Sequence, residues 1–203
     1  MARPAGLPWE VAASLAISGE TAYRTLGLLG VTGRGAAGTT LLVHGASGGV
    51  GTVAVQLAAL RGARVIGTAG PAQLDRVRSL GVKAVPHGAG WAGRVRALAP
   101  NGVDAVLDLS GHDVLEDSIA LAGGPDAVVT IADRRAAELG VRYSRGLLHR
   151  VGMAEVFADL LPALLDGRIT VHVAHRLPLA EAATAHRISE EGHPGGRIVL
   201  AVR

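Results

Sequence analysis

Residues 40–51 read T-L-L-V-H-G-A-S-G-G-V-G, an apolar run that ends abruptly in a glycine-rich turn. The run predicts a buried strand over Leu41–Val43, and the residues after the turn predict a helix over Val50–Leu60. This junction constrains the fold more than any other feature, because a buried strand that passes through several glycines directly into a helix is typical of nucleotide-binding α/β units.

Apolar β-branched runs and helical periodicity alternate along the following residues. Segments such as D-A-V-L-D-L and D-A-V-V-T-I are continuously apolar, as strands buried on both faces are. Alternation of such strands with helices predicts an α/β fold with a Rossmann-type, doubly wound parallel sheet and a six-stranded core. We expect further strands over 64–67, 82–85, 104–109, 127–131, 169–173 and 197–202, and helices over 74–80, 91–98, 114–121, 133–140, 153–165 and 179–190.

The glycine turn has more than one interpretation. In a phosphate loop, small residues let the backbone approach a pyrophosphate, and free N–H groups of the helix meet its charge. The small residues here are Ala46, Ser47, Gly48, Gly49 and Gly51. They exceed what a tight turn without a ligand needs, although that reading stays open.

The spacing G-x-S-x-G also permits a nucleophile elbow at Ser47. Ser47 would then need an acid, Asp108 or Asp133, and a histidine, His186 or His193. A hydrolase sheet places several strands ahead of its elbow, whereas about 40 mainly helical residues precede this turn. The phosphate loop is therefore favoured.

The end of the second predicted strand bears on the choice of dinucleotide. The segment G-T-A-G-P-A-Q-L-D-R has no acidic residue where a carboxylate would bind the ribose 2′-hydroxyl of NAD, and Asp75 already belongs to the next helix. Arg76 and Arg78 follow nearby, and a 2′-phosphate needs a cation. We therefore predict that the cofactor is NADP, with NAD as the alternative. The other interpretation of the two arginines is that both lie on the solvated surface.

Composition excludes several classes of protein. No cysteine is present, so disulfides and thiolate nucleophiles are excluded and zinc would need His and carboxylate ligands. Two Trp, two Tyr and one Phe with scattered basic residues argue against nucleic-acid binding. No stretch approaches the roughly 18 apolar residues of a membrane span, and no signal peptide is recognisable, so we expect no membrane association and a cytoplasmic location.

A few polar residues invite a functional role. His172 and His175 are three apart on a predicted strand and point to opposite faces, so no metal site is predicted. His44 could contact a cofactor, but a buried, hydrogen-bonded structural histidine is favoured. Tyr23 and Tyr143 are the only phenols available as general acids, and nothing places either near a substrate. No catalytic residue is assigned.

The chain resembles the zinc-independent quinone oxidoreductase branch, the zeta-crystallin-like reductases, of the medium-chain dehydrogenase/reductase family. The resemblance implies an NADPH-binding domain, hydride transfer to a quinone or enone as small-molecule substrate, and a homodimer that pairs sheet edges. The matching stretches are L-P-W-E-V-A-A-S-L-A-I-S-G-E-T-A-Y-R-T-L, L-L-V-H-G-A-S-G-G-V-G-T-V-A-V-Q-L-A, R-V-I-G-T-A, D-A-V-L-D-L-S-G and E-E-G-H-P-G-G-R-I-V-L.

The resemblance also assigns cofactor contacts. Leu74 stands where many relatives have a lysine, so Arg76 would have to substitute for it, and His87 stands where relatives often have a tyrosine. The implied contacts are Ser47, Gly48, Gly49 and Val50 at the pyrophosphate, next to Ala46, then Thr68, Ala69 and Gly70 at the adenosine ribose, and Ser110 and Ile131 along the cofactor towards the nicotinamide.

The resemblance implies that relatives begin with a GroES-like barrel, and we expect this chain to correspond to the part that follows the barrel. We expect one domain over 1–203, with a leading helical segment over 1–35, a nucleotide-binding core over 36–178, and a helix and strand over 179–203 that remain from the barrel side. An apolar face there would need an oligomer or a separate GroES-like partner chain to cover it.

Two other functions stay open at this point. The chain could be a dinucleotide-binding or scaffold module that lost catalysis with its barrel. Alternatively, the fold could carry out a non-redox reaction on a small metabolite. An oxidoreductase should both bind NADPH and oxidise it in the presence of an acceptor, and these two measurements distinguish it from the other two functions.

Overall fold

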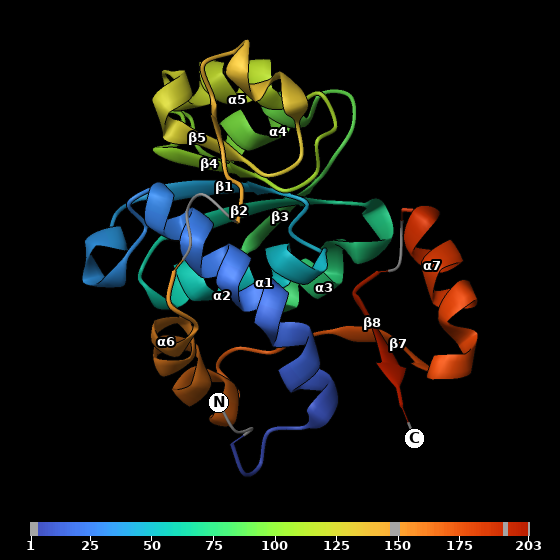
Figure 1. Cartoon of the computed structure of the whole chain (residues 1–203). Helices are drawn as coiled ribbons and strands as arrows, with labels where there is room; N and C mark the ends of the chain where they lie inside the picture. Colours follow the sequence, from blue (N-terminus) through green and yellow to red (C-terminus); the bar gives the residue numbers. More distant parts are fainter. Residues whose placement is uncertain (1–3, 147–150, 193–194, 203) are drawn as a thin grey trace.

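A computed structural model describes residues 4–146, 151–192 and 195–202. Helices cover both faces of a six-stranded parallel sheet, and a two-stranded parallel sheet lies to one side (Figure 1). The strand order β3-β2-β1-β4-β5-β6 is doubly wound, which confirms the predicted fold class. The strands are β1 Thr40–His44, β2 Arg64–Ala69, β3 Lys83–Pro86, β4 Ala105–Asp108, β5 Val128–Thr130 and β6 Arg142–Tyr143.

Two hydrophobic clusters, one on each face, hold the layers together. Leu15, Val53 and Leu160 belong to the cluster beneath α1, α2 and α6, whereas Leu42 and Leu115 belong to the cluster on the α4 and α5 face. The strands are continuously apolar because both faces are covered, and all five residues of β1 are buried. The helices are α1 Trp9–Leu28, α2 Gly49–Leu60, α3 Leu74–Ser79, α4 Trp91–Leu98, α5 Leu115–Ala122 and α6 Met153–Leu165, with 3₁₀ turns η1 Gly33–Ala36, η2 Pro71–Gln73 and η3 Pro125–Ala127.

The strand predicted over 169–173 is wrong. The side chain of Gln56 takes both backbone groups of Thr170, donating to its carbonyl at 2.9 Å and accepting from its N–H at 2.9 Å, so neither is free for a strand ladder. The sixth strand of the main sheet is instead β6, which has only two residues and no apolar run to predict it. The helix predicted over 133–140 is shorter than expected, a 3₁₀ turn η4 over Arg134–Ala137.

The end of the chain forms a unit beside the main sheet. Strand β7, Val173–Pro178, pairs in parallel with β8, Arg197–Ala201, and the segment between them contains η5, Leu179–Glu181, and α7, Ala182–Glu190. Figure 1 places α7 at the outer side of this pair. The predicted last helix and strand are confirmed, but β7 lies within the range assigned to the core.

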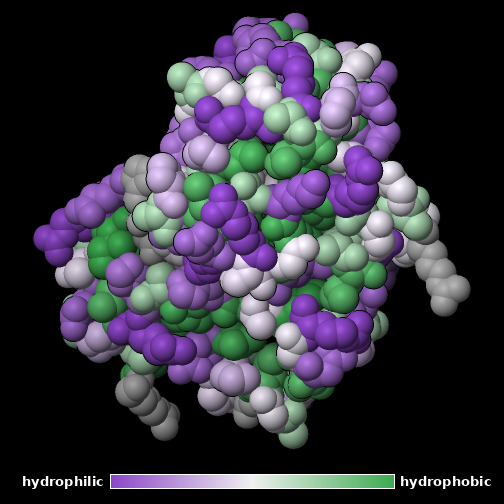
Figure 2. Space-filling model, turned by 180° about the vertical axis from the view of Figure 1, so that it is seen from behind, coloured by the Kyte–Doolittle hydropathy of each residue, from purple (hydrophilic) through white to green (hydrophobic). Residues whose placement is uncertain are grey.

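Exposed apolar side chains gather on elements around the small sheet. Trp9 and Ile17 on α1 are 70% and 64% exposed, and Leu179 and Val202 beside β7 and β8 are 52% and 77% exposed. Seen from behind, the molecule mixes hydrophobic and hydrophilic residues without one continuous apolar area (Figure 2). Among the described helices, none combines the length and hydrophobicity that a membrane crossing requires.

Candidate cofactor-binding site

The turn between β1 and α2 is packed too tightly for side chains at two glycines. A Cβ at Gly51 would overlap the carbonyl oxygen of Gly45 and lie 2.8 Å from the Cα of Ala46. A Cβ at Gly67 on β2 would lie 2.6 Å from the Cβ of Ala46. These glycines are required by the close approach of helix and strand, whether or not a ligand binds.

Gly48 and Gly49 need a different explanation. A Cβ at Gly48 would lie 3.4 Å from the oxygen of Gly45, whereas the three atoms nearest to a Cβ at Gly49 all belong to the side chain of Arg197. The closest obstacle to a side chain at Gly49 is therefore a flexible side chain and not the backbone. A close approach of another group to the backbone gives a reason for glycine here.

Free backbone donors surround these glycines. In the described part of the chain, the N–H groups of Ser47, Gly49, Val50 and Gly51 have no acceptor, whereas that of Gly48 is bonded within the turn at 3.0 Å. They lie at the positive end of the dipole of the twelve-residue helix α2. Unpaired N–H groups at a helix N-terminus bind phosphate or another anion.

Arg197 is a further candidate site residue, one that the sequence alone did not indicate. It begins β8, and its Cγ and Nη1 would each lie 3.3 Å from a Cβ at Gly49. Its guanidinium has no hydrogen bond or ion pair with any described residue. A cation over a helix N-terminus is repelled by the helix dipole, and an anion bound between them removes that repulsion. The available signal was an arginine directly after two glycines in G-G-R-I-V-L.

Arg76 joins the turn to the end of the chain. One nitrogen donates to the carbonyls of Ser47 and Gly195, each at 2.8 Å, and Nε donates to Gln73 at 3.0 Å. Nη1 is buried without a partner among the described residues, and burial lowers the pKa of the guanidinium. Leu74 packs against the apolar core. A 2′-phosphate contact by Arg76 stays a prediction.

The other predicted contacts lie at the same edge, because the strands are parallel. Thr68 lies at the end of β2 next to Ala69, and its carbonyl accepts from the N–H of Ala46 at 3.0 Å. Ser110 follows β4, and Ile131 follows β5 and donates its N–H to the carbonyl of Asp108 at 3.1 Å. The fold thus brings the predicted residues together along the carboxyl edge, where α/β sheets bind ligands.

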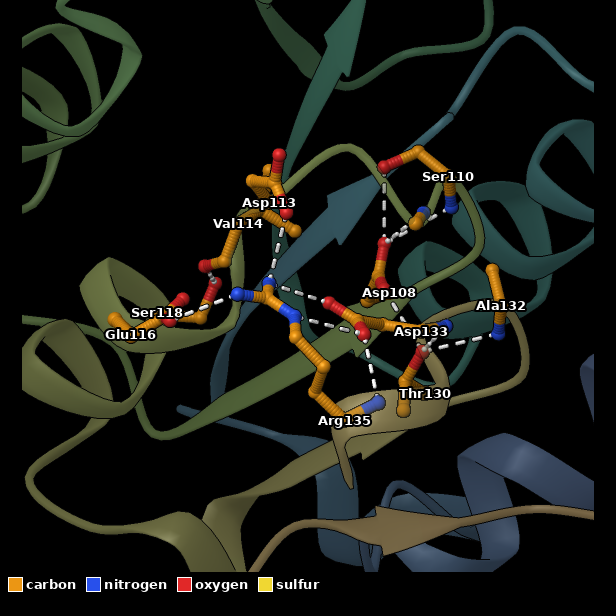
Figure 3. A network of polar contacts seen from close by, with 11 residues as sticks. Asp108, Ser110, Asp113, Val114, Glu116, Ser118, Thr130, Ala132, Asp133 and Arg135 are labelled. Atoms are coloured by element: carbon orange, nitrogen blue, oxygen red, sulfur yellow. Dashed lines mark hydrogen bonds and ion pairs between the residues drawn. The ribbon is translucent and has the colours of Figure 1, made fainter. Parts of the chain in front are cut away.

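Asp108 fixes the loops that follow β4 and β5 (Figure 3). One carboxylate oxygen accepts from the N–H and hydroxyl of Ser110, each at 2.9 Å, and the other accepts from the hydroxyl of Thr130 at 2.7 Å. Arg135 closes the network by bonding Asp133 at 2.8 Å, and this hydrogen bond lowers the pKa of the Asp133 carboxyl. Both carboxylates are therefore engaged in holding loops.

The described residues contain no hydrolytic triad around Ser47. Its hydroxyl has no histidine partner, and Asp108 and Asp133 bond no histidine. His186 is exposed on α7, and His193 lies outside the described residues. Tyr143 donates to the carbonyl of Ile131 and Tyr23 to Glu155, so both phenols already have acceptors.

His44 is a buried structural residue. Ser118 donates its hydroxyl proton to the carbonyl of Val114 at 2.6 Å, so its oxygen accepts from Nε2–H of His44 at 3.1 Å. Nδ1 then accepts from the hydroxyl of Thr68 at 3.1 Å, and Trp91 packs edge-on against the ring. Burial lowers the pKa of His44 to about 4, while the nearby charge of Asp108 partly opposes that shift.

Comparison with known proteins identifies the family. The zinc-binding dehydrogenase profile matches residues 80–200. The chain belongs to this family. Within the described residues, His, Asp and Glu side chains nowhere gather in threes around a point that could hold a metal ion, and cysteine is absent from the sequence. The described residues therefore offer no set of donors that fits a zinc ion.

Proteins similar to this chain include quinone oxidoreductases, which confirms the resemblance stated from the sequence. The chain is 31% identical to a chloroplast envelope quinone oxidoreductase homolog from Arabidopsis thaliana, covering 98% of this chain and 64% of the relative. It is 33% identical to a spectinabilin polyketide synthase system protein from Streptomyces orinoci, covering 94% of this chain and 9% of that protein.

A solved structure extends the likeness to three dimensions. The quinone oxidoreductase from Thermus thermophilus, solved alone and in complex with NADPH, superimposes with a TM-score of 0.81 at 30% identity. All of this chain and 69% of that chain are covered. The chain spans less than two thirds of the length of the curated relatives described above.

Proposed function

We propose that this chain is an NADP(H)-dependent oxidoreductase of the quinone or enone reductase type, or the cofactor-binding domain of one. The free N–H groups of Ser47, Gly49, Val50 and Gly51 at the start of α2 carry the proposal, because they suit the diphosphate of a dinucleotide. The quinone oxidoreductase relatives and the NADPH complex of the Thermus protein support it.

NADPH supplies the hydride when it is bound, and the protein binds and orients it. The turn and Arg197 hold the diphosphate, Thr68, Ala69 and Gly70 border the ribose, and Ser110 and Ile131 line the way to the nicotinamide. The described residues include no proton donor that we assign to the substrate. We propose that this reaction does not use zinc, and the lack of a zinc-binding cluster among the described residues is compatible with that.

The choice of NADP over NAD rests on charge at the end of β2. Gly70 begins the loop after β2, and no carboxylate stands there to accept a hydrogen bond from the 2′-hydroxyl of NAD. Arg76 is near, with Nη1 unpaired among the described groups. NAD is the alternative cofactor.

Thermal unfolding with NADPH, NADH and neither ligand tests this function. NADPH at about 100 times its dissociation constant should raise the free energy of unfolding by roughly 2.7 kcal/mol. NADH at the same concentration should stabilise less, and NADPH should be oxidised when a quinone or enone is added. Binding of NADPH without its oxidation would favour a dinucleotide-binding or scaffold module. An unfolding temperature that neither dinucleotide changes would contradict the proposal.

The R197A substitution should weaken the binding of NADPH about tenfold. It removes one hydrogen bond to a charged group, which contributes about 1.5–3 kcal/mol. R197K should retain part of the affinity through its charge. R187A, on the exposed face of α7, is the matched control and should bind like the wild type. Titration calorimetry measures all four proteins, and equal affinities in R197A and the wild type would remove Arg197 from the site.

A homodimer through the edge of the main sheet is the proposed assembly, and a separate GroES-like chain is the alternative partner. Strand β6 lies at one edge of the sheet, next to β5, and its short ladder leaves that edge available for pairing. Light scattering after size exclusion should give twice the chain mass. A monomeric mass at all concentrations tested would contradict the homodimer.

A further inference from the structure

A cavity of about 270 Å³ opens at the amino edge of the main sheet, where β1, β2 and β3 begin. Thr40, Arg64 and Lys83 are the first residues of these strands, and all three line the cavity. The candidate cofactor contacts lie at the other end of the same strands. Because β2 has six residues and a strand rises about 3.3 Å per residue, its two ends are about 17 Å apart. The cavity is therefore separate from the candidate cofactor-binding site.

The walls of this cavity are mostly apolar. They come from β2, from the residues that precede β2 and β3, and from α2 and α4 on the two faces of the sheet, and they include Ala59, Ala63, Val65, Ile66, Val82 and Leu98. The volume equals that of about nine water molecules, at roughly 30 Å³ each. It lies just below the roughly 300–1,000 Å³ of ligand pockets, so only a small molecule can fill it.

Two cationic side chains of the cavity have no counter-ion among the described residues. The guanidinium of Arg64 donates to the hydroxyl of Thr40 at 3.0 Å and forms no ion pair, and the ammonium of Lys83 has neither a hydrogen bond nor an ion pair there. Asp104, a carboxylate at the same edge, accepts from the N–H of Thr40 at 2.7 Å instead. The cavity thus combines apolar walls with two unpaired positive charges.

The strand register places both cations on one face of the sheet. Lys83 is paired with Ile66, and Arg64 precedes Ile66 by two residues, so all three side chains point to the same side. A strand spacing of about 4.8 Å and a rise of about 3.3 Å per residue put the Cα atoms of Arg64 and Lys83 roughly 8 Å apart. Like charges at this separation repel each other, and an anion bound between them attracts both.

We propose that this cavity binds a small monocarboxylate with an apolar body, a ligand distinct from the cofactor and the substrate of the proposed function. The carboxylate lies between Arg64 and Lys83, because a guanidinium matches the two oxygens of a carboxylate and an ammonium adds a second charge. The apolar body fills the space between α2 and α4. An inorganic anion would leave the walls in water, and an uncharged molecule would leave the two cations without an anion.

Amide NMR titrations with benzoate, benzyl alcohol and inorganic phosphate test both halves of this proposal. Benzoate should give saturating shifts at Lys83 and Ala59, at the amino edge of the sheet. Benzyl alcohol keeps the apolar body without the charge, and phosphate keeps a charge without the body. Each should bind at least about tenfold more weakly than benzoate, because each loses one of the two contributions.

Variants locate the site. R64A and K83A should each weaken benzoate about threefold, as for an exposed ion pair, and the double variant about tenfold. A59L keeps every charge but fills the cavity from α2, so it should abolish saturation. R96A removes an exposed arginine of α4 that does not line the cavity, and it should bind benzoate like the wild type.

The outcomes decide between this cavity and other places on the protein. Benzoate that binds the double variant as tightly as the wild type would overturn the site, as would phosphate that binds as tightly as benzoate. Displacement of benzoate by NADPH, or shifts confined to residues 47–51, would place benzoate at the cofactor site and overturn the proposal as well. Circular dichroism melts show which variants fold. If A59L does not fold, the double variant still tests the site, because both of its substitutions replace exposed side chains.

Discussion

Replacing Gly49 with valine is expected to lower the affinity for NADPH at least about 100-fold while α2 remains folded. The new side chain would stand beside the free N–H groups of Gly49 and Val50, and it would displace the side chain of Arg197. Two hydrogen bonds to a charged group contribute about 1.5–3 kcal/mol each, and each 1.4 kcal/mol is roughly a factor of ten in affinity. Arg197 is a flexible side chain, so the fold itself can accommodate the change.

G93V is the matched control for this variant. Gly93 also lies in a helix, α4, and a Cβ there would meet nothing within 4 Å. Both variants should unfold at similar temperatures without ligand, and only G49V should lose affinity in titration calorimetry. If G49V bound NADPH as tightly as G93V, a diphosphate contact at this turn would be excluded.

Acid should destabilise the protein through His44 by about 3 kcal/mol, because its pKa falls from the usual 6.5 to about 4 in the folded protein. Because the folded protein keeps His44 neutral, the unfolded chain binds more protons between these two values. The contribution is therefore fully present above pH 6.5, is lost as the pH falls towards 4, and changes no further below it.

Denaturant unfolding of the wild type and H44Q between about pH 7 and 4 measures this contribution. H44Q should be less stable at neutral pH, because Thr68 and Ser118 lose a fitted partner, but its stability should depend less on pH. H172Q is the control. Partial burial and the charge of Arg76 also lower the pKa of His172, but His172 is far more exposed than His44, so its contribution to the pH dependence of stability should be smaller. Equal pH slopes in H44Q and the wild type would contradict the assignment.

The main sheet was predictable because its strands are buried on both faces. Apolar runs such as Leu41–Val43 have to avoid water on either side, and this requirement appears directly in the sequence. The run at 169–173 looked similar, but the side chain of Gln56, more than 100 residues earlier, is hydrogen-bonded to both backbone groups of Thr170. Strand β6 was missed because two residues at a sheet edge need no apolar pattern.

The candidate site was predictable where it is local and not where distant segments meet. The glycine turn is a continuous stretch, so its small residues could be singled out from the sequence as candidates. Arg197 reaches Gly49 only through the return of β8, and Arg76 binds the carbonyl of Gly195 across the same junction.

A crystal structure of this chain with NADPH would show directly whether the start of α2 binds the diphosphate. We expect diphosphate oxygens within hydrogen-bonding distance of the backbone nitrogens of Gly49 and Val50, with the Arg197 guanidinium turned onto the same group. A diphosphate bound elsewhere, with the start of α2 still covered by Arg197, would refute this assignment.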